Sequence, residues 1–147
     1  MARYEFGWDP ENELSPRPCI DIELGNSREL VACEPDFGFD YPDPLKVKAL
    51  LDTGASLTVI SKTLAKSRKL FATGANTEVR VLEHTIRCPE YAAAIGFPGG
   101  LRSFDPIRVR AADFEGERTH AVLIGTDIMR FWKITFDGRS KLVIIED

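Results

Sequence analysis

The sequence contains no hydrophobic run that approaches the ~20 consecutive apolar residues of a membrane-spanning helix. Its beginning, 1–8, carries Arg3 and Glu5 and includes no long apolar segment, so no secretory signal is predicted there. The chain also lacks internal repeats, low-complexity segments and domain linkers. We therefore expect a cytoplasmic protein with no membrane partner, built from an N-terminal arm over 1–17 and a single domain over 18–147.

Cysteine and histidine are scarce. The three cysteines are an odd number without Cys-x-x-Cys spacing, which is typical of free thiols in a reducing compartment. No cysteine has metal-ligand spacing with His84 or His120. The sequence therefore predicts neither a metal nor any other cofactor.

The sequence has no excess of positive charge, because 23 acidic residues outnumber 19 basic ones and the formal net charge is −4. The local gathering of Lys62, Lys66, Arg68 and Lys69 is typical of the solvated face of a helix. Without a strong basic field, nucleic acid is not expected as a main partner. There is no Gly-x-x-x-x-Gly-Lys phosphate loop either.

The chain does contain many short strand patterns separated by turn residues. Ile20, Ile22 and Leu24 alternate with acids, and 45–51 alternates in the same way. Further strands are expected at 29–33, 79–88, 107–111 and 121–124, with loops or turns at 35–44, 98–100 and 115–117. Ser61 is predicted to cap a short helix that runs to about position 70. This organisation indicates a mostly β domain.

Two segments stand out from this background. Asp52-Thr53-Gly54-Ala55-Ser56 lies between the apolar runs 47–51 and 57–60. A carboxylate between buried strands, with no evident cation, is costly unless function explains it. Gly54 permits a tight backbone and a close approach of its N–H to that carboxylate, while Thr53 and Ser56 offer hydroxyls that can brace the turn.

The second segment runs from Ala121 to Met129. Its four leading apolar residues predict a strand buried on both faces, and Gly125 lets that strand pass under the turn at Asp52. Asp127 or Thr126 is expected to cap a short helix. The sequence 133–145 then predicts a closing hairpin around Asp137-Gly138.

Together, Ala49 to Ser56 and Val122 to Met129 resemble the corresponding segments of the retroviral-type (retropepsin-like) aspartic protease family, single-lobe form. The resemblance covers roughly 45–145, and Gly125 follows Asp52 by 73 positions. It implies a closed β-barrel-like lobe with a short helix near the C-terminus, assembling as a C2 homodimer. Asp52 would be the catalytic residue, paired across the dimer axis, because the chemistry needs two carboxylates and the chain offers one copy of the motif.

The resemblance also implies a site around Asp52 that binds an extended peptide or protein substrate. Thr53, Gly54 and Ser56 would support the catalytic turn. A flap hairpin is expected within 77–90, with its tip near Glu83-His84-Thr85 or, alternatively, at Gly74-Ala75. Substrate contacts are expected from the following residues: Ala55, Glu83, His84, Thr85 and Ile124.

Other readings stay open. The flap segments are not glycine-rich, and Thr126 stands where family members commonly carry arginine. A retropepsin-like domain that binds peptides or dimerises without proteolysis is therefore an alternative, as is a monomer that completes its carboxylate pair with a partner protein. Asp127 as a second catalytic carboxylate in the same chain is disfavoured, since a helix cap explains it better.

Overall fold

The computed structural model describes residues 1–9, 17–33, 40–113 and 121–147. The strands are β1 (Arg3–Gly7), β2 (Cys19–Gly25), β3 (Leu45–Leu51), β4 (Val59–Ser61), β5 (Phe71–Val81), β6 (His84–Gly96), β7 (Phe104–Ala112), β8 (Val122–Ile124), β9 (Lys133–Asp137) and β10 (Leu142–Glu146), and the helices are α1 (Arg28–Ala32), α3 (Lys62–Ser67) and α4 (Thr126–Met129). None of the helices in these ranges has the length and apolar character needed to cross a membrane.

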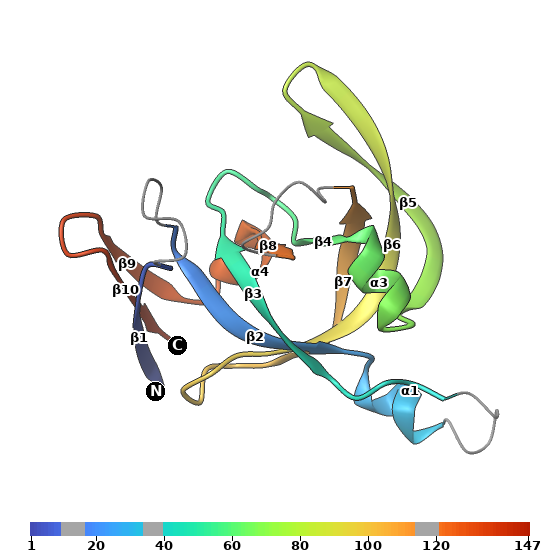
Figure 1. The fold of residues 1–147 in the computed structure, drawn as a ribbon, viewed down its shortest axis with the longest axis horizontal. Helices are drawn as coiled ribbons and strands as arrows, with labels where there is room; N and C mark the ends of the chain where they lie inside the picture. The colour runs from blue at the N-terminus through green and yellow to red at the C-terminus, as the bar shows by residue number, and fades with distance from the viewer. Residues whose placement is uncertain (10–16, 34–39, 114–120) are drawn as a thin grey trace.

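Six strands close into a barrel. In the order β2, β3, β8, β4, β7 and β6, each strand is hydrogen-bonded to the next. The barrel closes because β6 also pairs with β2, with Leu24 opposite Ile95. The pairs β3–β8 and β4–β7 are parallel, and the remaining pairs are antiparallel. The expected mostly β, closed barrel-like lobe is therefore confirmed (Figure 1).

The barrel core follows from the two-residue period of its strands. On β2, Ile20, Ile22 and Leu24 are at most 1% exposed, whereas the acids between them point outward. The inward-pointing side chains of β3, β4, β7 and β8 fill the rest of the interior: Ala49, Leu51, Ile60, Val109, Ala111, Val122 and Ile124. Each fully buried aliphatic side chain of the size of leucine contributes about 1.5–3 kcal/mol relative to exposure.

A smaller sheet of β1, β10 and β9 lies beside the barrel. The predicted closing hairpin is present as β9 and β10, but β1 was expected to be part of a loosely held arm. Instead, Arg3–Gly7 pairs with β10 along its whole length. Tyr4 and Phe6 alternate with polar residues, stack at 5.7 Å between ring centroids and pack against the core. Positions 10–16 of the expected arm lie outside the described residues.

The segment that follows β2 is a second correction, because the strand expected at 29–33 is helix α1. Arginine, glutamate, leucine and alanine in this segment all favour a helix. Asn26 ends β2 just before it: the side-chain amide donates to the carbonyls of Arg68 and Lys69 and accepts from the N–H of Phe71, all at 3.1 Å. The chain is thereby turned away from a returning strand.

The predicted cap at Ser61 is confirmed. Its hydroxyl oxygen accepts from the N–H of Leu64 at 3.1 Å, and α3 then runs over Lys62–Ser67, which is shorter than expected. The helix ends before Lys69, whose φ is +49°. The turn expected at 115–117 and part of the loop expected at 35–44 lie outside the described residues.

Candidate active site

Asp52 begins a tight turn directly after β3. Its backbone N–H donates to the carbonyl of Ile124 at 3.0 Å, so the turn is attached to β8. The carboxylate Oδ1 accepts from the N–H of Gly54 at 2.9 Å, and a Cβ on Gly54 would lie 3.3 Å from that oxygen. Asp52 is half-buried, whereas Thr53, Gly54 and Ser56 are exposed. The turn therefore presents one oriented carboxylate at the surface.

The second sequence motif lies directly against this turn. The N–H of Thr126 donates to the carbonyl of Ala55 at 2.8 Å. A Cβ on Gly125 would come within 2.6 Å of the carbonyl carbon of Leu57, so only glycine fits without displacement. Close approach of two backbones, rather than a special dihedral angle, is the reason for glycine at this position.

Thr58 and Asp127 connect the two motifs through a compact network. Thr58 is fully buried, donates from its hydroxyl to Asp127 Oδ1 at 2.8 Å and accepts from the N–H of Gly125 at 3.1 Å. Its backbone N–H donates to Asp127 Oδ2 at 2.9 Å. Gly125, not Asp127 or Thr126, occupies the cap position of α4. The prediction of a side-chain cap is therefore wrong, and Asp127 braces the segment that follows the Asp52 turn.

The hairpin of β5 and β6 extends from the barrel on the side of the Asp52 turn (Figure 1). Val81 pairs with His84, so the two turn residues are Leu82 and Glu83. Glu83, His84 and Thr85 are exposed at or beside this turn. The alternative tip at Gly74-Ala75 is wrong, because both residues lie inside β5.

One expected substrate contact is also corrected. Ile124 is 0% exposed and belongs to the barrel core, so its side chain faces away from any ligand on the surface. Its contribution to the site is the carbonyl that holds Asp52. The adjacent Leu123 is half-buried and points to the opposite face of β8. Alternation predicts that Leu123 and Ile124 point to opposite faces of β8, but the sequence does not show which of the two faces the core.

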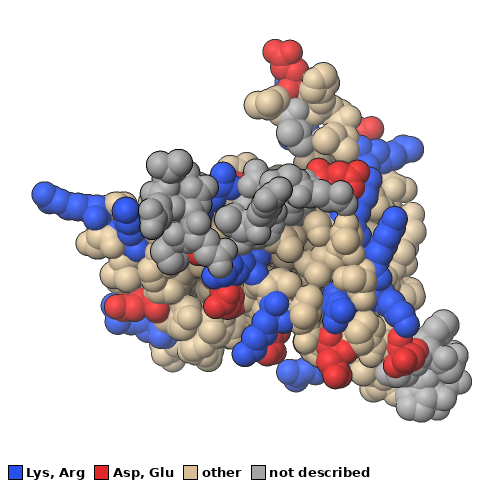
Figure 2. Space-filling view, in the orientation of Figure 1, with Lys and Arg blue, Asp and Glu red and all other residues tan. Residues whose placement is uncertain are grey.

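Within the described ranges, no three histidine, cysteine, aspartate or glutamate side chains lie close enough together to hold a metal ion. Cys19 and Cys88 are buried and Cys33 is exposed, and none of the three forms a disulfide. Burial raises the pKa of the Cys88 thiol above its ordinary value, an effect partly offset by nearby Lys62. Figure 2 shows basic and acidic side chains interspersed over one face of the molecule.

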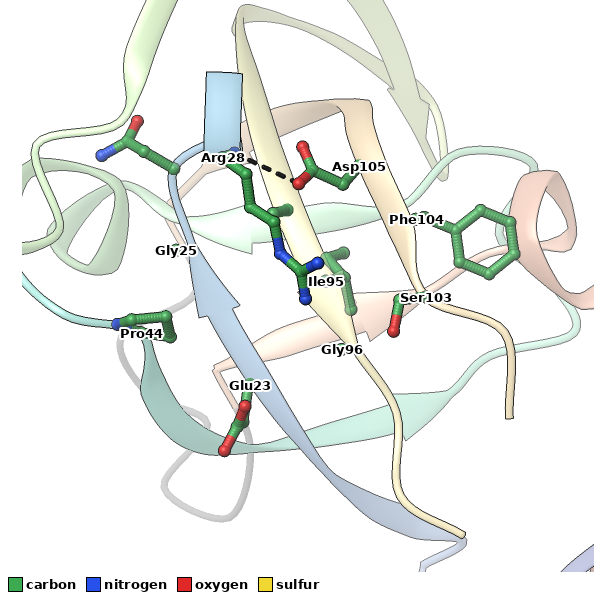
Figure 3. Close-up of a pocket in the computed structure, with 11 residues that line it drawn as sticks. Glu23, Gly25, Arg28, Pro44, Ile95, Gly96, Ser103, Phe104 and Asp105 are labelled. Atoms are coloured by element: carbon green, nitrogen blue, oxygen red, sulfur yellow. Dashed lines mark hydrogen bonds between the residues drawn. The ribbon is translucent and has the colours of Figure 1, made fainter. Parts of the chain in front are cut away.

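A hollow of about 400 Å³ lies elsewhere, at the seam where β2 meets β6. Figure 3 shows the Arg28 side chain reaching across it from the start of α1, with Glu23 and Asp105 on either side. The N–H of Arg28 donates to Asp105 Oδ2 at 3.1 Å. No residue of the Asp52 turn lines this hollow, so it is separate from the candidate site.

The fold has counterparts among solved structures, although no protein-family model matches the sequence and no curated protein matches it. A retropepsin-like aspartic protease from Rickettsia conorii aligns with a TM-score of 0.57 and 16% identity, covering 98% of each chain. The retroviral protease-like domain of Ddi1 from Leishmania major aligns at 0.45 and 12% identity, covering 87% of this chain and 88% of that one. The first of these comparisons establishes the class of fold.

The chain accordingly has the retropepsin-like fold expected from its two motifs. A sequence identity of 16% establishes the fold but does not establish an activity.

Proposed function

We propose that the protein is an aspartic endopeptidase that works as a C2 homodimer, with Asp52 of each subunit at the axis. The observation that carries this proposal is the Asp52 turn, which is fixed at both ends to β8 and α4 and presents its carboxylate at the surface. Among the described residues, Gly54 donates to Oδ1, and Oδ2 is left available to a second carboxylate or to water.

The chemistry follows from placing two such carboxylates together. At contact distance both cannot ionise, so the pair holds one proton, as in the aspartic-protease dyad. The ionised member takes a proton from a water molecule, whose oxygen attacks the scissile carbonyl carbon. The protonated member donates to the carbonyl oxygen. Collapse of the tetrahedral intermediate breaks the C–N bond: the departing nitrogen takes the proton that the first carboxylate removed from water, and a hydroxyl of the intermediate returns a proton to the second carboxylate.

A second subunit is needed because Asp127 is committed to another task. Both of its oxygens accept hydrogen bonds from Thr58, which brace the turn. Two copies of the chain related by a two-fold axis would supply the missing carboxylate through an isologous interface. The substrate would be an extended segment of polypeptide, lying between the β5–β6 hairpin and the Asp52 turn. The three cysteines without disulfides support a reducing compartment such as the cytoplasm.

The decisive experiment replaces Asp52 with asparagine. Wild type is incubated with a diverse peptide library at mildly acidic pH, with and without pepstatin, and products are detected by mass spectrometry. We expect pepstatin-sensitive cleavage that falls at least about 1,000-fold in Asp52→Asn, because the amide cannot act as a base. Asp21→Asn changes an exposed carboxylate on β2 and should cleave like wild type. An Asp52→Asn protein with undiminished activity excludes the assignment.

A peptide-binding domain without proteolytic activity is the second candidate. It is favoured by the hairpin turn Leu82-Glu83, which contains no glycine, and by Thr126 in place of arginine beside the site. Binding of library peptides without any cleavage would support it. Sedimentation at micromolar concentration separates a constitutive dimer from a monomer that pairs with another protein.

A further inference from the structure

A continuous row of side chains crosses the barrel from β3 to β6. Leu50 pairs with Leu123, Leu123 with Val59, Val59 with Arg110, and Arg110 with Glu90. The row begins two residues before Asp52 and ends at the base of the β5–β6 hairpin.

This row lies on the outer face of the barrel wall. On β3, β8, β4 and β7, the flanking residues point inward and are at most 4% exposed: Ala49, Leu51, Val122, Ile124, Thr58, Ile60, Val109 and Ala111. On β6, Pro89 and Tyr91 on either side of Glu90 are half-buried. Successive side chains of a strand point to opposite faces, so the row members face away from the core. The first three are aliphatic, and the last two form an ion pair.

The ion pair is unusually well buried for the surface of a small domain. Glu90 is 6% exposed, and its Oε2 lies 3.4 Å from Arg110 Nη2. The Arg110 side chain is 15% exposed, and its Nε donates to the hydroxyl of Thr77 at 3.3 Å. Thr73 donates to Glu90 Oε1 at 2.9 Å. Glutamate and arginine are seldom buried unless they are paired, and the contacts of Glu90 with Arg110 and Thr73 meet that condition.

The charges in this cluster do not cancel. Arg108 Nε lies 3.8 Å from Glu90 Oε1, and its side chain is 77% exposed. Among the described residues, these two guanidinium groups therefore share a single carboxylate, while Arg110 Nη1 also donates to the carbonyl of Arg108 at 3.4 Å. If the ion pair only held the hairpin against the barrel, no excess charge would be needed. Packed apolar residues of similar volume often stabilise a protein as well as a buried ion pair does. The excess positive charge instead suits an acidic group brought by a ligand.

We propose that Arg110, held by Glu90 at the end of this row, is a specificity-determining residue that selects an acidic side chain in the peptide. This inference rests on the proposed peptidase function. Three inter-strand steps of about 4.8 Å separate β3 from β7, which gives about 14 Å, or about four residues of extended peptide. Because the arginine and glutamate side chains are both long, the acidic residue lies two to four positions from the scissile bond.

In a two-fold symmetric dimer, each half of the peptide meets one copy of the row. The preferred acidic residue can therefore lie on either side of the scissile bond.

The test compares matched peptides. A neutral peptide that wild type cleaves in an Asp52-dependent manner is remade with single glutamines and, separately, single glutamates at each position. The readout is the ratio of kcat/KM for the glutamate peptide to that for its glutamine partner. We expect a ratio of about ten at one position two to four residues from the bond, decreasing as salt screens the interaction.

Two variants move this ratio in opposite directions. Arg110→Gln keeps a donor for Thr77 but removes the charge, and its ratio should fall to about one. Glu90→Gln leaves both guanidinium groups without a carboxylate, and its ratio should rise above that of wild type. General loosening of the hairpin cannot produce opposite changes. Arg139→Gln, at the exposed turn after β9, should keep the wild-type ratio.

The outcomes separate the two proposals. Asp52-dependent cleavage with a ratio that neither variant changes, or that both change in one direction, overturns the role of Arg110 alone. Absence of Asp52-dependent cleavage of every peptide overturns the peptidase function and this inference with it.

Discussion

Replacing Gly125 with alanine tests whether the contact between the two motifs holds the Asp52 turn in place. The added methyl group would lie 2.6 Å from the carbonyl carbon of Leu57, 2.8 Å from its oxygen and 2.9 Å from Asp127 Oδ1. The first two atoms belong to the backbone, so relief requires the chain before β4 to move away from α4. The φ of Gly125 is −91°, which alanine adopts readily, so the cost is steric.

The size of the effect can be estimated from overpacking. Forcing a methyl group into a packed site costs about 1–3 kcal/mol. Alanine also restricts the unfolded chain, which offsets about 0.4–1 kcal/mol of that cost. A domain of this length loses about 2–4 °C in Tm for each kcal/mol. We therefore expect the melting temperature to fall by several degrees, measured at one fixed protein concentration because dimerisation affects Tm.

Gly138→Ala is the matched control. Nothing lies within 4 Å of a Cβ at Gly138, and its φ is not in the positive range, so the melting temperature should stay close to that of wild type. Activity adds a second measurement. A displacement of about 1 Å at the Thr126–Ala55 hydrogen bond can reduce the rate about 100-fold even in folded protein. If Gly125→Ala is as stable and as active as Gly138→Ala, the steric argument is wrong.

Three further predictions concern stability. Thr58→Val leaves the N–H of Gly125 without its hydroxyl acceptor and should lower the free energy of unfolding by about 1–3 kcal/mol in urea titration, whereas Thr58→Ser should retain most of it. Asn26→Ala removes all three hydrogen bonds of the buried amide and should cost about 2–4 kcal/mol; wild-type stability would show that the amide does not fix the end of β2. Hydrogen bonds from Ser140 lower the pKa of Asp137, so its stabilising effect is present above the unfolded pKa and is lost as pH falls through the folded one. The stability difference between wild type and Asp137→Asn should therefore shrink below about pH 4, and a difference that grows on acidification contradicts this assignment.

Local signals accounted for much of the fold. Ser61 was recognised as a cap because a hydroxyl before a helical stretch acts within four residues. The turn at Asp52 and the strand before Gly125 were predicted because their patterns are short and specific. Their mutual contact was predicted from Gly125, because a residue without a side chain lets one backbone pass close under another.

The missing parts depend on distant partners. Arg3–Gly7 becomes a strand because β10, far away in sequence, lies beside it. Four apolar residues in a row do not reveal the inward face, so the sequence predicts a substrate contact from Ile124, whose side chain the structure places in the core. The pairing of Glu90 with Arg110 depends on the register between the consecutive strands β6 and β7, which shifts at an irregularity between Ala93 and Ile95 that the sequence pattern did not reveal.

The pairing of β1 with β10 has a consequence for protein engineering. The N–H of Asp147 donates to the carbonyl of Ala2 at 3.0 Å, so the two ends of the described chain are neighbours. A short glycine-rich linker can join them, and new ends can be opened at an exposed turn such as Gly138, giving a circularly permuted protein. Such a rearranged chain would keep every strand contact while changing the order in which the strands are synthesised.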